Sequence, residues 1–308
     1  MRLEIVQYDS FTDRAFSGNP AAVVCDADGL EEDAMLAIAR EMNLSETAFV
    51  FQAEEPGVDF RFRWFTPEAE VPFCGHATLA AAFALNAAGR WPASGDRSVA
   101  RVTCRIGELR LSGEGENLLE RVWIDVPWAT LVELPETDAI YEACGIPADQ
   151  RQVAGWRPLW NRARAKAVLP VTSAAALGAA QPDFVRLRHL AEELGCVLVL
   201  VTPEVREPES LVQTRVFAPH FGVDEDPVTG SANAILACYL DQLGWLAGRE
   251  GVTRRGIAGG EVLGYRAEQG DFLGRPGRVS VEVVTAEGHK LARIGGAAVR
   301  VLEGTLFA

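Results

Sequence analysis

The chain has 308 residues, of which 48% are hydrophobic and 23% charged, a composition typical of a globular protein with one large or two ordinary domains. Its net charge of −14 argues against a partner such as nucleic acid or an anionic membrane, because both bind clustered lysine and arginine. No apolar stretch approaches the roughly 18 residues of a membrane helix, and the N-terminus lacks the pattern of a secretory signal. We therefore expect a cytoplasmic protein without a membrane span.

The first half contains an amphipathic helix, with apolar residues at helical spacing from Met35 to Met42. Asn43 suits the left-handed C-cap of this helix. A β-rich run, Thr47–Phe51, and a strand end at Arg63–Pro67 follow. A loop from Glu70 to Gly75 then opens an apolar helix.

The second half repeats this order. Phe184–Leu194 has the same helical spacing, and Gly195 suits its C-cap. The apolar run 196–201 predicts a strand, and Arg215–Pro219 predicts a second strand end. A loop from Glu225 to Gly230 then opens another apolar helix.

The two halves are similar in sequence as well as in order. Residues 70–85 match residues 225–240 at an offset of 155, with six of sixteen positions identical, and the Arg-x-Phe-x-Pro segments match at 152. We predict two similar α+β lobes, 1–128 and 129–289, with residues 290–308 returning to the first. One αβ domain with accidental similarity is the alternative. Matching lobes favour a ligand site between them.

Positions at which the matched halves differ are candidates for catalytic residues. At an offset of 152, Glu46 stands opposite Leu198, so only the first half carries a carboxylate there. Partial burial would suit Glu46 to general acid–base catalysis. The alternative is a solvated turn residue.

The loops Cys74–Ala77 and Thr229–Ala232 each precede an apolar helix, where free backbone N–H groups and the helix dipole favour an anion such as a carboxylate. The glycines also fit an ordinary tight turn, with Thr229 or Ser231 as the helix cap.

His76 stands where the second loop has Ser231, and Asp226 stands where the first has Val71. The helix dipole should lower the pKa of His76 and leave its ring neutral. A structural histidine and a solvated loop aspartate are the ordinary alternatives. With Glu46, these residues are the titratable differences expected of one catalytic site.

Cys74 is a candidate nucleophile, because a thiol at a helix N-terminus is often reactive. Its counterpart is Thr229, which excludes a racemase with one cysteine from each half. A hydrolase using Cys74 and His76 is disfavoured, because neighbouring side chains across one turn seldom reach the required geometry and no orienting acid is evident.

The remaining cysteines and histidines form no recognisable metal motif. The six cysteines lie 30 or more residues apart, without a Cys-x-x-Cys pair, and only four histidines are present. We expect reduced thiols, mostly in the core, and no metal site.

Together, several motifs resemble the phenazine biosynthesis-like (PhzF-like) isomerase family, which has the diaminopimelate epimerase fold. The resemblance covers nearly the whole chain, and its motifs are Phe16–Val23, Asn43–Phe49, Phe65–Pro67, Cys74–Leu79, Asp226–Ala232 and Gln269–Gly270 with Gly274–Pro276.

The resemblance implies two lobes, each a mixed, barrel-like sheet around a central helix, and a homodimer. It implies that Glu46 removes a proton from one carbon of a small carboxylate-containing substrate and returns a proton elsewhere, without a cofactor. The other residues that it assigns to catalysis or substrate binding are Asn19, Ser45, Gly75, His76, Asp226, Thr229, Gly230 and Ser231. A non-catalytic small-molecule binder on the same fold is an alternative. The sequence does not name the substrate.

Overall fold

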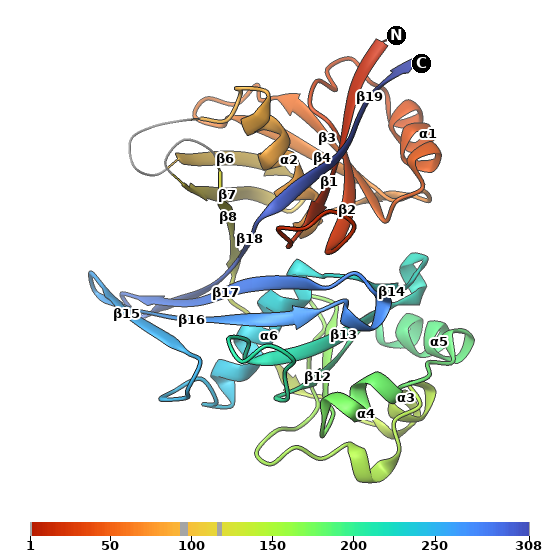
Figure 1. Cartoon of the computed structure of the whole chain (residues 1–308), viewed down its shortest axis with the longest axis vertical. Helices are drawn as coiled ribbons and strands as arrows, with labels where there is room; N and C mark the ends of the chain where they lie inside the picture. Colours follow the sequence, from red (N-terminus) through yellow and green to blue (C-terminus); the bar gives the residue numbers. More distant parts are fainter. Residues whose placement is uncertain (1, 93–97, 116–118, 308) are drawn as a thin grey trace. The chain divides into compact units, whose positions relative to one another are not determined.

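The computed structural model describes residues 2–92, 98–115 and 119–307, and divides the chain into two compact units. Unit 1 comprises Met1–Asp125 and Gly295–Ala308, and unit 2 comprises Val126–Ile294. The C-terminal strand β19 returns to unit 1, where it pairs antiparallel with β1 (Figure 1). Within the described residues, no helix is long and apolar enough to cross a membrane.

Unit 1 is a mixed β-sheet. Neighbouring strands pair in the order β19, β1, β2, β3, β4, β6, β7 and β8, and β5 pairs with β4; the β2–β3 and β4–β6 pairs are parallel and the others antiparallel. The strands are β1 (Arg2–Ser10), β2 (Asn19–Val24), β3 (Glu46–Gln52), β4 (Phe60–Phe65), β5 (Glu70–Val71), β6 (Ser98–Cys104), β7 (Gly107–Glu114), β8 (Arg121–Pro127) and β19 (Ala298–Phe307).

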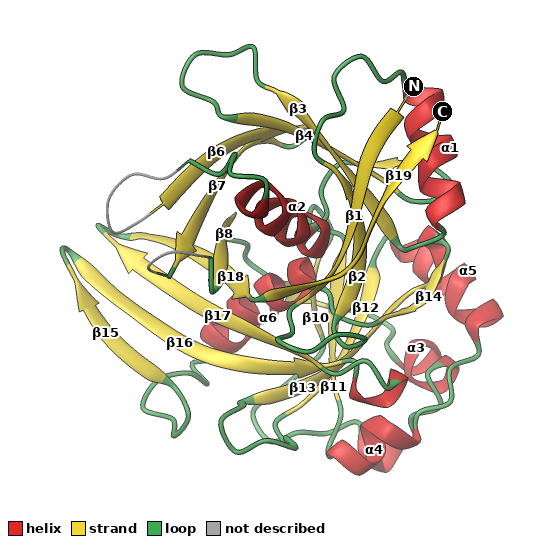
Figure 2. Cartoon of the chain, turned by 45° about the horizontal axis from the view of Figure 1, so that its top comes forward, coloured by secondary structure: helices red, strands yellow, loops and turns green. Residues whose placement is uncertain are grey.

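The two helices of unit 1 are buried to different extents. Helix α1 (Glu32–Met42) is amphipathic and ends at Asn43, which adopts the expected left-handed conformation with φ 50°. Helix α2 (Gly75–Ala87) is apolar on all sides and lies inside the curved sheet (Figure 2). A helix without a polar face is stable only when it is enclosed in this way.

Unit 2 repeats the strand arrangement. Its strands pair in the order β9, β10, β11, β12, β13, β16 and β17, with parallel β11–β12 and β13–β16 pairs, while β14 pairs with β13 and β15 with β16. The strands are β9 (Val132–Glu133), β10 (Leu159–Asn161), β11 (Lys166–Pro170), β12 (Val197–Thr202), β13 (Val212–Ala218), β14 (Val223–Asp226), β15 (Thr253–Ile257), β16 (Gly260–Gln269), β17 (Gly277–Ala286) and β18 (His289–Gly296).

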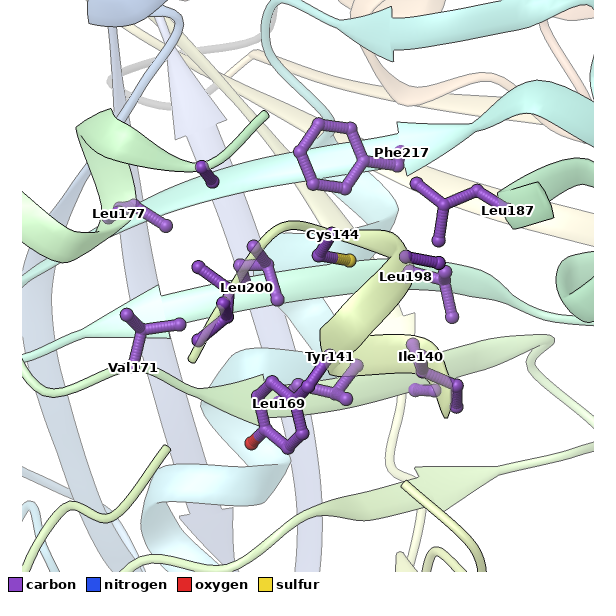
Figure 3. Packing of buried hydrophobic residues seen from close by; sticks show 14 of the residues in the cluster. Ile140, Tyr141, Cys144, Leu169, Val171, Leu177, Leu187, Leu198, Leu200 and Phe217 are labelled. Atoms are coloured by element: carbon purple, nitrogen blue, oxygen red, sulfur yellow. The ribbon is translucent and has the colours of Figure 1, made fainter. Parts of the chain in front are cut away.

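Small helices cover one face of this second sheet. Figure 3 shows the core that they enclose, in which Phe217 and Leu198 of the sheet pack with Leu187 and Cys144. The apolar helix α6 contacts β11 and β17. The helices are α3 (Asp138–Ala143), α4 (Ala174–Ala179), α5 (Phe184–Leu194) and α6 (Gly230–Gln242), with 3₁₀ turns at Ala148–Gln150, Pro219–Phe221 and Asp271–Leu273.

The structure confirms the internal repeat but corrects one pairing inferred from it. Helices α2 and α6 begin and end at the same offset of 155. In the strand pairing, however, the matched phenylalanines Phe65 and Phe217 lie across from Thr47 and Leu198, respectively. The counterpart of Glu46 is therefore Val197 and not Leu198, because one residue more separates the helix cap from the strand in unit 1. The residue of unit 2 that corresponds to Glu46 is therefore still apolar.

The repeated Arg and Glu residues form the same ion pair in each unit. Arg63 donates to both carboxylate oxygens of Glu70 at 2.9 and 2.6 Å, and Arg215 binds Glu225 in the same way at 2.9 and 2.7 Å. Two parallel N–H···O bonds fix both side chains. In each unit the ion pair stabilises the loop that precedes the central helix. These repeated residues therefore have a structural role.

Candidate active site

Four of the expected site residues of unit 1 form one group with the candidate nucleophile Cys74, and we call these five residues the unit 1 cluster: Asn19, Ser45, Glu46, Cys74 and His76. The His76 ring lies at its centre. Nδ1 is 3.1 Å from the Asn19 amide nitrogen and 3.3 Å from the Cys74 sulfur. Nε2 is 3.3 Å from the Ser45 hydroxyl and 3.4 Å from Glu46 Oε2. The sequence-predicted residues of this unit therefore lie together.

Local backbone structure brings the cluster together. Gly18 has φ +61°, and a β-carbon there would lie 2.1 Å from the Ser10 carbonyl oxygen, so only glycine allows β2 to start at Asn19. The Ser10 hydroxyl donates to the His76 carbonyl at 2.8 Å and joins β1 to the start of α2. Glu46 is the first residue of β3, with 18% of its side chain exposed.

His76 is a neutral hydrogen-bonding group rather than a cation. Burial lowers the pKa of its ring to about 3, partly offset by a hydrogen bond to the backbone of Pro20. The direction agrees with the sequence prediction, but burial is the main cause. Proline has only a carbonyl to offer, so the ring nitrogen facing it carries the proton and the other keeps a lone pair. Near pH 7 the His76–Glu46 contact therefore involves a neutral imidazole and is not an ion pair.

Cys74 and His76 are in contact, which corrects the sequence-based expectation. As the N-cap residue of α2, Cys74 has extended backbone angles (φ −139°, ψ 115°), and its sulfur lies 3.3 Å from the imidazole. The expectation that neighbouring side chains would not reach this geometry is wrong. An acid beside the histidine is also present, since Glu46 reaches the ring from β3.

The neutral state of His76 predicts a pH-dependent stability. Below pH 6.5 the unfolded chain takes up a proton that the folded chain refuses until about pH 3, so the free energy of unfolding falls by up to about 1.4 kcal/mol per pH unit in this window. Between pH 7 and pH 5, wild type should lose about 2 kcal/mol more than His76→Gln. Urea unfolding in chelator-containing buffer measures this difference. Parallel pH curves for the two proteins would contradict a lowered pKa.

The expected site residues of unit 2 lie around the start of α6. The Thr229 hydroxyl donates to the Asp226 carboxylate at 2.5 Å. Gln269 donates to the Asp226 carbonyl at 2.8 Å and accepts from the Thr229 N–H at 3.0 Å. Gln269 Oε1 also accepts from Asn233 at 3.3 Å. Gln269 therefore holds the loop that carries Asp226 and Thr229.

Gly75 and Gly230 begin α2 and α6, and Ser231 is the second residue of α6. Neither N-cap side chain accepts a hydrogen bond from its helix. Thr229, which the sequence offered as a cap, instead donates to Asp226. The first-turn N–H groups of both helices are thus not used by their N-cap residues, as a site for an anionic group requires.

Two polar residues of unit 2 have surroundings that the sequence did not predict. Gln269 belongs to one of the family motifs, but its separation from Thr229 along the chain hides its contacts. Lys166 is the first residue of β11 and stands in no motif. Burial lowers the pKa of Lys166 to about 8, while the nearby charges of Cys196 and Asp226 act in the opposite direction. The position of Lys166 in the apolar run before Pro170 is the one feature of the sequence that indicates its burial.

The role of Gln269 can be tested against a second buried glutamine. Gln269→Met should cost about 3 kcal/mol of folding free energy, because the Thr229 N–H and the Asp226 carbonyl each lose a buried partner. Gln213, on the adjoining strand β13, is equally buried, but its amide has no hydrogen-bond partner among the described residues. Gln213→Met should therefore be neutral or stabilising. Equal costs in urea unfolding would refute the assignment.

The fold is a mixed α+β arrangement in which the same sheet-and-helix plan occurs twice, and unit 1 carries a carboxylate, a thiol and a neutral imidazole in contact. Proteins named as epimerases are among the solved structures that share this fold. The phenazine biosynthesis-like protein family model (PhzC-PhzF) matches residues 8–304, and the chain belongs to this family. The resemblance inferred from its motifs is confirmed.

Individual relatives agree with this assignment. An uncharacterized isomerase of Pseudomonas aeruginosa is 37% identical, with 99% of each chain covered. The crystal structure of a PhzF-family phenazine biosynthesis protein from Bacillus anthracis matches with a TM-score of 0.84, 24% identity and full coverage of both chains. A hydroxyproline epimerase from Agrobacterium vitis, solved with trans-4-hydroxy-L-proline bound, shares the fold alone, with a TM-score of 0.58, 12% identity and coverage of 99% and 92%. The expected fold class is confirmed.

Proposed function

We propose that the protein is an isomerase or epimerase that moves a proton on a small carboxylated substrate, with Glu46 as the proton carrier. The Glu46 carboxylate accepts a proton from a carbon next to a carbonyl or conjugated acid, and the C–H electron pair passes into the conjugated system. The same carboxyl group then returns a proton to another carbon, or to the opposite face of the first. Both steps use one side chain, so the proposal needs no cofactor.

The observation that carries this proposal is the placement of Glu46 against His76. The carboxylate is half-buried, within 3.4 Å of the imidazole, while His76 itself is buried and neutral. A neutral imidazole can donate to the carboxylate or to charge that develops on substrate, without neutralising the base as an imidazolium would. The exposed fraction of Glu46 leaves it open to a substrate.

Support for the substrate class comes from the helix starts and from the relatives. The first-turn N–H groups at Gly75 are suited to a carboxylate. Relatives are named isomerases, and the hydroxyproline epimerase with this fold was solved with a small amino acid bound. We propose Ser45 and Asn19 as further substrate contacts in unit 1. The substrate-binding or catalytic roles expected for Asp226, Thr229, Gly230 and Ser231 stay predictions. The homodimer and the cytoplasmic location stay predictions.

Isotope exchange tests the proposal even while the substrate is unidentified. The purified protein is incubated in heavy water with a panel of small amino, hydroxy and unsaturated carboxylic acids. Proton NMR and mass spectrometry should show deuterium at carbon in at least one acid. Cys74→Ala should retain the exchange, and Asp226→Asn should reduce it. Absence of exchange across a broad panel would count against an isomerase.

A thiol hydrolase is the second candidate, because Cys74, His76 and Glu46 adopt the order of a nucleophile, a base and an orienting acid. The low pKa of His76 makes it a weak base for the thiol, and the cysteine is 6% exposed, which places this reading second. Release of alcohol or amine from activated esters and amides, abolished by Cys74→Ala, would favour the hydrolase instead.

A further inference from the structure

Three different metal-binding groups converge in the unit 1 cluster. Single ligand atoms of Glu46, Cys74 and His76 all lie within 4.8 Å of one another. Glu46 comes from the start of β3, and the other two from the N-terminus of α2. The spacing of cysteines and histidines along the sequence predicted no metal site, because the third group, Glu46, is neither of these residue types and lies on the separate strand β3.

Two of the three ligand–ligand distances are close to those of a tetrahedral zinc site, and the third, between Glu46 and Cys74, is within 4.8 Å. Bonds of about 2.0 Å to nitrogen and oxygen and about 2.3 Å to sulfur place tetrahedral ligands about 3.3 Å (N to O) and about 3.5 Å (N to S) apart. His76 Nε2 lies 3.4 Å from Glu46 Oε2 and 4.0 Å from the Cys74 sulfur. The first separation already fits, and the second needs a side-chain shift of about half an ångström.

The chemistry of the group also suits a metal of the zinc type. Thiolate, imidazole and carboxylate are the ligands that Zn²⁺ binds in proteins. With Nε2 bound to a metal, Nδ1 carries the ring proton, and the Asn19 side-chain amide, 3.1 Å from Nδ1, would turn its oxygen to accept that proton; such outer contacts are typical of metal-binding histidines.

We propose that Glu46, Cys74 and His76 bind Zn²⁺ reversibly, with the fourth position left to water, and that the bound ion holds the protein inactive by occupying the Glu46 carboxylate. The Cys74 S–H bond breaks, a zinc–sulfur bond forms, and the proton passes to solvent, so nothing is oxidised or reduced. Metal binding follows from the cluster geometry alone. The inhibition rests on the proposed function.

Co²⁺ is the probe for binding, because its thiolate complexes absorb in the near ultraviolet whether or not the protein is active. Titration of chelator-treated, full-length protein should give this absorption at one equivalent, and Zn²⁺ should displace it. Cys74→Ser should abolish the band. His76→Gln and Glu46→Gln should each weaken Zn²⁺ binding by calorimetry at least about tenfold. Circular dichroism verifies that each variant is folded.

Cys104→Ser is the matched control. Cys104 lies in the same unit on β6 and is partly exposed, so it is the more accessible thiol, but it is not one of the three clustered ligands. This variant should keep the band and the Zn²⁺ affinity. Absence of the band in wild type, or its loss in Cys104→Ser and not in Cys74→Ser, overturns the proposal.

Isotope exchange separates this inference from the proposed function. If exchange is found, one equivalent of Zn²⁺ should suppress it at least about tenfold, and chelator should restore it. Co²⁺ binding without exchange in any acid would leave the metal site standing and refute the isomerase. Exchange that is unaffected by bound Zn²⁺ would refute the inhibition, while exchange without Co²⁺ binding would refute the metal site alone.

Discussion

Replacing Glu46 with glutamine should lower the rate of deuterium incorporation on the order of 10²–10⁴-fold, the usual contribution of a general acid–base group. Glutamine has nearly the same size and can still contact His76, but its amide does not accept a proton from carbon. The thermal midpoint should change little, because the side chain is partly exposed and its ring contact can be kept. The rate is measured by NMR in heavy water with the acid that wild type exchanges.

Glu41→Gln provides the control for this substitution. Glu41 lies five residues earlier, on the exposed face at the end of α1, so the same chemical change there should leave exchange unaltered. Glu46→Asp should be intermediate, because it keeps the carboxylate but withdraws it by one methylene. Undiminished exchange in Glu46→Gln would exclude Glu46 as the proton carrier.

Arg215→Met should cost about 3–5 kcal/mol of folding free energy, because it leaves the buried Glu225 carboxylate without its cation. The arginine and glutamate side chains are 9% and 8% exposed, so water replaces little of the lost interaction. The Leu177 and Ala180 carbonyls, at 3.1 and 2.9 Å, also lose their donor. Urea unfolding of wild type and variant measures the loss.

The repeat supplies its own control. Arg63→Met removes the equivalent pair in unit 1, but Arg105 remains 3.4 Å from Glu70, and Arg63 is more exposed than Arg215. The cost there should be about 1–2 kcal/mol. Adding Glu225→Leu to Arg215→Met should recover most of the loss, because both charges are then gone. Equal costs in the two units would show that neither Arg105 nor the greater exposure of Arg63 lowers the cost of losing the pair.

The elements that were predicted well have local signals at both ends. Helix α5 runs from Phe184 to Leu194, as its apolar spacing predicts, because the Asp183 side chain caps its N-terminus and Gly195 its C-terminus. The strand after α1 starts one residue earlier than expected, at Glu46. Strand starts depend on pairing with other strands, so the sequence predicted them less closely than helix ends.

The residues of the unit 1 cluster can all be chosen from the sequence, but their contacts cannot. The Cys74–His76 approach depends on the extended backbone of Cys74 before α2, which spacing along the chain does not reveal. The role of Gln269 depends on β16 pairing in parallel with β13. Both contacts depend on geometry between neighbouring elements or within one turn, where residue type alone carries little information.

The sequence by itself determined the duplicated plan, the family and the identity of the polar residues of the candidate site. Repeated motifs and the periodic spacing of apolar residues can be recognised directly in the sequence. Only the tertiary structure decided that Val197 is the counterpart of Glu46 and that burial keeps His76 neutral. It also decided that the Cys74 thiol and the Glu46 carboxylate both contact the His76 ring. The physical reason is that strand register and burial fix the distances and the local dielectric, and these determine whether neighbouring groups exchange protons or bind a metal.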